Sequence, residues 1–160
     1  TVLQGMMVVV FHLAEEDYGI ETLLVREIIL HQPARPLPAA PAWLEGVIDY
    51  RGKVVPVVHL GCRLGRGVLP LEAAARIIVY EGSTGRSWGL LVDSVSAVVQ
   101  VGREQLDEGV GQWQPQGLPT RWLAGLARLT SRPVALLTMD EVLAAGTAEA
   151  EAALSEDGLA

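Results

Sequence analysis

The sequence has few cysteines and few aromatic residues. Its single cysteine, Cys62, excludes an intramolecular disulfide, so a reducing compartment is favoured and we expect the protein in the cytoplasm. Aromatic residues make up 5% of the chain and hydrophobic residues 50%, so the core must consist mainly of valine, leucine and isoleucine. At 160 residues, the chain is long enough for one domain or for two small lobes that share a core.

Positive charge and long apolar runs are also scarce. The net charge is −7, which argues against binding to nucleic-acid phosphates or to an anionic membrane surface. No apolar run approaches the roughly 20 residues of a membrane-spanning helix, and Thr1 begins no recognisable signal peptide. We therefore expect no nucleic-acid partner and no direct insertion into a membrane.

What the sequence does contain is an internal repeat. Residues 43–60 read WLEGVIDYRGKVVPVVHL, and residues 122–139 read WLAGLARLTSRPVALLTM. Upstream, VVVFHL followed by Tyr18-Gly19-Ile20 is echoed by RIIVY followed by Trp88-Gly89-Leu90. Two copies of one small β unit are the natural interpretation. A duplicated β scaffold suggests two similar faces for partners rather than one catalytic cleft.

Most of the chain has the pattern of β-strands. Alternation of valine or alanine with other residues over 94–101 predicts a strand with one principal buried face. Gly52 supplies the positive φ of a tight hairpin turn after Arg51, and Pro56 predicts that the second hairpin strand lies at an edge or bulge. We expect a long loop over 102–120. Near the C-terminus we expect short helices and an acidic tail, about 147–160, that is solvated or frayed.

The sequence marks no catalytic centre. His59 and Cys62 have a spacing that suits two metal ligands, but a metal site usually needs three or four. A nucleophilic Cys62 would need a base and an orienting group, and GCRLGRG over 61–67 lacks the Gly-Lys-Ser/Thr ending of a phosphate loop. We therefore expect no enzyme, no metal and no cofactor. The alternative is a small β-barrel enzyme or ligand-binding protein with a site between the lobes near His59 and Cys62, which a filled apolar core there would exclude.

The predicted hairpin tip is the strongest candidate for a binding surface. It places Tyr50, Arg51 and Lys53 on a rigid turn. Most arginines at such tips are simply solvated. However, alternation places Val25 and Glu27 on one face of the preceding strand, and a Glu27–Arg51 ion pair would orient the arginine for a partner.

These segments resemble the CheW family of chemotaxis coupling proteins. The similarity rests on YGIETLLVREI, APAWLEGVIDYRGKVVPVVHLGCRLG, RSWGLLVDSVSAVVQV, WLAGLARLTSRPVALL and MDEVL, and it covers roughly residues 6–145. It implies a mainly β fold of two intertwined five-stranded barrels of the Src-homology-3 type with a short C-terminal helix, which together form one CheW-like domain over 1–160. It also implies a non-enzymatic adaptor that binds the cytoplasmic tip of methyl-accepting chemoreceptors and the regulatory domain of the histidine kinase CheA.

The same resemblance implies which residues contact partners. Val25, Glu27, Gly46, Arg51 and Gly52 match family positions associated with partner recognition, and Tyr50 joins them at the tip. Gly46 and Gly52 fit turn and bulge geometry equally well, and Val25 fits a core position.

The chain also departs from the family pattern. His59 stands where the family usually has aspartate, and Tyr50 stands where leucine is more common. These departures suggest a divergent subgroup, such as one that serves a pilus or another non-flagellar pathway. A stand-alone adaptor is favoured, and a fragment of a longer protein stays open because Thr1 is not a start methionine.

Overall fold

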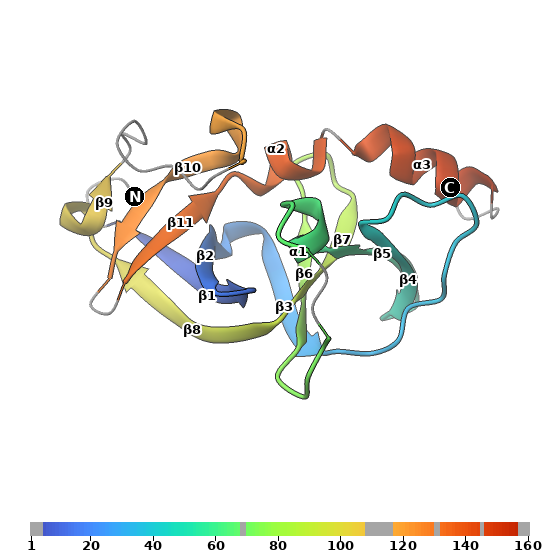
Figure 1. The fold of residues 1–160 in the computed structure, drawn as a ribbon, viewed down its shortest axis with the longest axis horizontal. Coiled ribbons are helices and arrows are strands. Elements are labelled where there is room, and N and C mark those ends of the chain that lie inside the picture. Colours follow the sequence, from blue (N-terminus) through green and yellow to red (C-terminus); the bar gives the residue numbers. More distant parts are fainter. Residues whose placement is uncertain (1–4, 68–69, 108–116, 130–131, 145, 157–160) are drawn as a thin grey trace.

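The computed structural model describes residues 5–67, 70–107, 117–129, 132–144 and 146–156. Two β-sheets lie side by side, and two of the three α-helices follow one edge of the molecule (Figure 1). The strands are β1 (Met6–Leu13), β2 (Glu16–Glu21), β3 (Val25–Leu30), β4 (Leu44–Tyr50), β5 (Lys53–His59), β6 (Arg76–Glu81), β7 (Ser87–Val92), β8 (Ser94–Val101), β9 (Leu106–Asp107), β10 (Leu123–Arg128) and β11 (Pro133–Leu137). The helices are α1 (Leu60–Arg63), α2 (Met139–Ala144) and α3 (Thr147–Glu156), with 3-10 turns at Thr22–Leu24, Arg103–Gln105 and Thr120–Trp122.

Each sheet takes strands from both halves of the chain. The six-stranded sheet has the order β8-β1-β2-β11-β10-β9, and the five-stranded sheet has the order β3-β6-β7-β5-β4. The first hairpin, β1–β2, therefore joins the C-terminal hairpin through parallel pairing of β2 with β11. In the same way, β6–β7 joins the β4–β5 hairpin through parallel pairing of β7 with β5. The two halves exchange their first hairpins, so the sheets are intertwined as expected.

The sequence repeat is a structural repeat. The Trp43 carbonyl accepts the N–H of His59 at 2.7 Å, and the Trp122 carbonyl accepts the N–H of Thr138 at 2.8 Å. In both copies, a bulge follows directly after the tryptophan in the first strand of the hairpin. It lies at Leu44–Gly46 in one copy and at Leu123–Gly125 in the other. Because equivalent residues occupy equivalent positions, each hairpin ends in a short helix, α1 or α2.

The sheets differ in detail from two closed five-stranded barrels. The short strand β9 adds a sixth member to the first sheet by pairing with β10. In neither sheet do the backbone ladders described return to the starting strand. The fold is mainly β, with two open, intertwined sheets.

One apolar cluster joins the two sheets. It contains buried residues of both sheets and of all three α-helices. Valine, leucine and isoleucine dominate this cluster, as the low aromatic content predicts. Arg63 lies at its margin, with its guanidinium 5.2 Å from the centre of the Trp43 ring and 4.8 Å from that of Trp122. Burial lowers the pKa of this guanidinium. The two repeat tryptophans thus enclose one cation.

Pro56 does not lie in an edge strand. Strand β5 has β4 on one side and β7 on the other. The parallel ladder with β7 covers only Val57 to His59, however, so Pro56 lies just before it. Its missing N–H therefore breaks no bond in that ladder.

The acidic C-terminal segment is packed rather than solvated over 147–156. Ala150, Ala153 and Leu154 of α3 are buried, and Glu151 pairs with Arg86 at 2.6 Å. Its small side chains, Ala150 and Ala153, pack into the large apolar cluster. Residues 157–160 of the predicted tail, like 108–116 of the predicted long loop, are outside the described residues. No helix among the described residues is both long and apolar enough to cross a membrane.

Candidate partner-binding site

The hairpin of β4 and β5 has a tight two-residue turn. Arg51 and Gly52 both have positive φ, at 50° and 80°. Such a turn matches the right-handed twist of the two strands, and glycine adopts its second position without steric cost. The carboxylate of Asp49 also accepts the Gly52 N–H at 3.0 Å. The predicted turn at Gly52 is confirmed.

Three side chains meet at this turn: Glu27 from β3, Tyr50 from the end of β4 and Arg51 from the turn itself. Oε1 of Glu27 on β3 accepts the Tyr50 hydroxyl at 2.6 Å and Nη2 of Arg51 at 2.9 Å. The Arg51 guanidinium also lies 5.5 Å from the centre of the Tyr50 ring. The predicted Glu27–Arg51 pair is therefore present, and Tyr50 completes it.

This contact shows that the five-stranded sheet is strongly curled. β3 and β4 are its opposite edges. With strands about 4.8 Å apart, the edges of a flat sheet of this size would be separated by about 19 Å. Side chains that bond across this distance can do so only if the sheet bends around its core. Glu27, Tyr50 and Arg51 thus connect the two edges where the backbone ladder does not.

The three groups stabilise one another's charge states. Hydrogen bonds from Tyr50 and Arg51 hold the pKa of the Glu27 carboxyl below its usual range. The hydrogen bond between Tyr50 and Glu27 also raises the pKa of the Tyr50 hydroxyl, because an ionised tyrosine would face the Glu27 carboxylate. Glu27 is therefore charged at neutral pH, and on the acid side the arrangement is lost as the pH falls through this lowered pKa. The Arg51 side chain is 74% exposed, so most of its guanidinium faces solvent.

Val25 does not share a face with Glu27. A bulge between Val25 and Glu27 places one extra residue, Arg26, in β3. Val25 therefore packs with Ile28 against the large core cluster, whereas the Tyr50 ring beside Glu27 packs against a different cluster. The alternation argument is wrong here because a bulge shifts the side-chain phase by one residue. Val25 is half-buried, in line with the core interpretation.

Gly46 has a backbone role. Its φ is 143°, and a Cβ there would overlap the carbonyl oxygen of Arg35. The linker approaches so closely because Arg35 and Val47 exchange two backbone hydrogen bonds, at 2.8 and 2.9 Å. Gly46 therefore lets the proline-rich linker lie on β4. Gly52, in contrast, has no atom within 4 Å of a Cβ position.

His59 and Cys62 form a helix cap. The His59 side chain is 3% exposed, and its Nδ1 accepts the backbone N–H of Cys62 at 3.1 Å. Among the described residues, no three histidine, cysteine or acidic side chains are grouped to hold a metal. The neighbours of His59 in the chain, Val58 and Leu60, are buried in the apolar cluster that joins the two sheets. This packing argues against an enzyme or ligand site between the lobes near His59 and Cys62.

The structure adds Arg26 and Glu81 to the residues that the sequence singled out. They line a groove of about 400 Å³ beside the hairpin, together with Tyr50, Arg51, Lys53, Val79 and Ser87. Arg26 lies there because of the bulge, and its Nε donates to Glu81 at 2.8 Å. The only sequence signal was the position of Arg26 next to Glu27.

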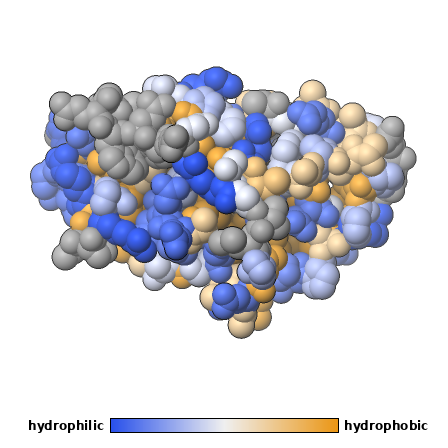
Figure 2. Space-filling model, viewed as in Figure 1, coloured by the Kyte–Doolittle hydropathy of each residue, from blue (hydrophilic) through white to orange (hydrophobic). Residues whose placement is uncertain are grey.

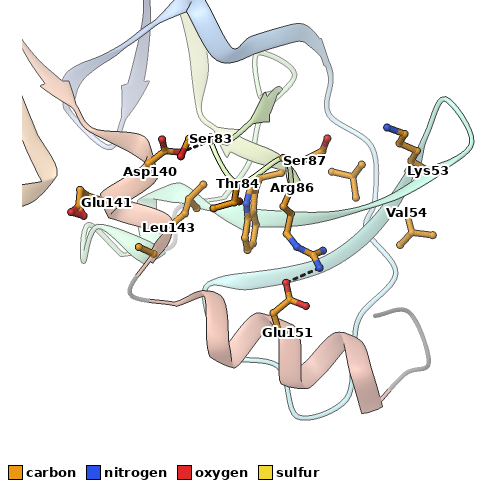
Figure 3. Close-up of a pocket in the computed structure, with 15 residues that line it drawn as sticks. Lys53, Val54, Ser83, Thr84, Arg86, Ser87, Asp140, Glu141, Leu143 and Glu151 are labelled. Atoms are coloured by element: carbon orange, nitrogen blue, oxygen red, sulfur yellow. Dashed lines mark hydrogen bonds and ion pairs between the residues drawn. The ribbon is translucent and has the colours of Figure 1, made fainter.

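A second, wider groove of about 1000 Å³ lies between β5, the β6–β7 turn and the helices α2 and α3 (Figure 3). Arg86 of the turn pairs with Glu151 of α3, and Asp140 of α2 accepts the Ser83 N–H at 3.3 Å. These contacts fasten the helices to the turn. Hydrophobic and hydrophilic residues are interspersed on the half of the surface over α3, whereas the half over β8 and β9 is largely hydrophilic (Figure 2).

Comparison with known proteins identifies relatives of this chain. A family model described as the CheW-like domain matches residues 7–146. The chain belongs to the CheW-like domain family. It is 30% identical over 143 residues to the chemotaxis protein CheW of Klebsiella aerogenes, which covers 87% of this chain and 82% of that protein. It is 29% identical over 131 residues to the CheW of Treponema pallidum, at 78% and 74% coverage.

A solved structure of the family has the same fold. The crystal structure of the scaffolding protein TtCheW from Thermoanaerobacter tengcongensis matches with a TM-score of 0.75 and 29% identity. The match covers 84% of this chain and 89% of that one. The two-sheet arrangement is therefore that of a CheW scaffold.

Proposed function

We propose that this chain is a non-enzymatic chemotaxis adaptor that couples methyl-accepting chemoreceptors to a CheA-type histidine kinase. The observation that carries the proposal is membership of the CheW-like domain family over 7–146, together with the TtCheW scaffold fold. Duplication supports it on physical grounds, because two intertwined sheets offer two separate surfaces. An adaptor needs such a pair of surfaces, whereas an enzyme needs one convergent site.

Six residues form the proposed partner-binding site, in two roles. Glu27, Tyr50 and Arg51 would face the partner, since their side chains are half-buried or exposed and already joined. Val25, Gly46 and Gly52 would act by shaping the backbone beneath them. An exposed ion pair contributes only about 0–1 kcal/mol to stability, so the value of the Glu27–Arg51 pair lies in orientation.

We also propose the wider family features for this chain. Each sheet would correspond to one Src-homology-3-like barrel, and residues 1–160 would form one domain of two lobes with an acidic C-terminal segment. The partners would be the kinase regulatory domain and the cytoplasmic tip of the receptor. The adaptor would then act in the cytoplasm and reach membrane receptor arrays only through these partners.

Arg51→Ala should weaken receptor binding without unfolding the protein. The exposed guanidinium would be lost, and we expect the Kd for a purified cytoplasmic receptor fragment to rise about 10-fold in calorimetry, as for a moderately important interface residue. Arg103→Ala is the matched control, because Arg103 is an exposed arginine on the other sheet's side. Equal affinities for Arg51→Ala and wild type would contradict this role of the hairpin.

A further inference from the structure

The groove beside the hairpin concentrates positive charge. Arg26 comes from β3, Arg51 from the turn and Lys53 from the start of β5, and all three line the same 400 Å³ space. The lining contains one carboxylate of its own, Glu81, and Glu27 pairs with Arg51 beside it, so three cations face two carboxylates. In a chain with a net charge of −7 and only 12 basic residues, this is a local reversal of sign.

The three cations differ in how far they are neutralised. Arg26 is paired with Glu81, and Arg51 donates a hydrogen bond from Nη2 to Glu27. Lys53, the single lysine of the chain, makes no ion pair within the part of the chain that the structure describes. Its ammonium is therefore available to an outside anion.

Lys53 is also well placed to meet a partner. Its side chain is exposed and lies at the rim of both grooves. Figure 3 shows it at one end of the wide groove, apart from Asp140, Glu141 and Glu151. The acid of the hairpin itself, Asp49, is occupied by the Gly52 N–H and does not line the hairpin groove.

We propose that this groove recognises an acidic segment of the receptor, with Lys53 and Arg51 pairing with its carboxylates. This proposal rests on the proposed function above. A carboxylate suits the groove because guanidinium groups bind it through paired N–H donors and an ammonium attracts it as a point charge. A short acidic segment meets only the local positive field, whereas a long polyanion such as nucleic acid would also meet the overall negative charge.

Charge reversal at Lys53 tests the proposal. Charges at the edge of an interface act mainly on association rate and on salt dependence. For Lys53→Glu we expect association with the cytoplasmic receptor fragment to slow about 10-fold at low salt, with little change in dissociation. Lys53→Gln should give an intermediate rate, and Arg103→Glu should leave the rate close to that of wild type. Surface plasmon resonance at two salt concentrations measures the association and dissociation rates and their salt dependence. Circular dichroism checks that each variant is folded.

The outcomes separate this inference from the proposed function. If wild type binds the receptor fragment and Lys53→Glu associates equally fast, the acidic-segment inference is wrong and the adaptor function stands. If Lys53→Glu slows binding to the kinase regulatory domain only, the receptor is the wrong occupant and the inference also fails. If wild type binds neither protein, both proposals fail. Recovery of the association rate when an acidic receptor residue is changed to lysine in the Lys53→Glu background would support the direct pairing.

Discussion

Gly46→Ala should lower the free energy of unfolding by about 3 kcal/mol or more. A Cβ at this position overlaps the Arg35 carbonyl, so the linker must move away from β4. That movement breaks two backbone hydrogen bonds between Arg35 and Val47, each worth about 1 kcal/mol, and adds strain of about 1–3 kcal/mol at a positive φ. Denaturant unfolding followed by tryptophan fluorescence measures this loss.

Gly52→Ala is the matched control for that experiment. Gly52 also has a positive φ, but a Cβ there meets no atom within 4 Å. Only the cost of left-handed backbone remains, about 1–2 kcal/mol. Equal losses for the two variants would contradict the role of Gly46 in the close backbone approach, since only at Gly46 would a Cβ overlap the Arg35 carbonyl.

Trp122→Ala should cost about 3–5 kcal/mol, the usual range for removing a large buried aromatic residue. Trp122 is 6% exposed, and its ring packs on the Arg63 guanidinium. Its repeat partner Trp43 is only half-buried, so Trp43→Ala should cost less. Thermal unfolding of the two variants compares equivalent positions within one molecule. A larger loss for Trp43→Ala than for Trp122→Ala would contradict this view of the core.

The repeat and the hairpin could be predicted from the sequence because both depend on local residue chemistry. The tryptophan and glycine of each repeat produce the same carbonyl contact and the same bulge in both copies. Likewise, the turn at Arg51–Gly52 follows from the need for positive φ, and the turn carries Arg51 to Glu27. The number of strands in the six-stranded sheet could not be predicted from the sequence, since the two-residue strand β9 has no sequence pattern of its own.

Other features depend on contacts between distant segments. The bulge at Arg26 reverses the face on which Val25 lies, and no alternation pattern reveals a bulge in advance. The groove beside the hairpin likewise forms only where β3, the β4–β5 hairpin and the β6–β7 hairpin come together. The packing of α3 was missed because its acidic residues suggested solvation, whereas the small residues Ala150 and Ala153 determine its contact with the core.

Whether this chain physically connects a receptor to a kinase can be measured in a three-component sedimentation assay. Receptor cytoplasmic fragments anchored on vesicles would be mixed with a CheA-type kinase from the same organism, with and without this protein. We expect the kinase to sediment with the vesicles only when the protein is present, and to a smaller extent when the Arg51→Ala variant replaces the wild type. Equal sedimentation of the kinase with and without the folded protein would contradict the adaptor function.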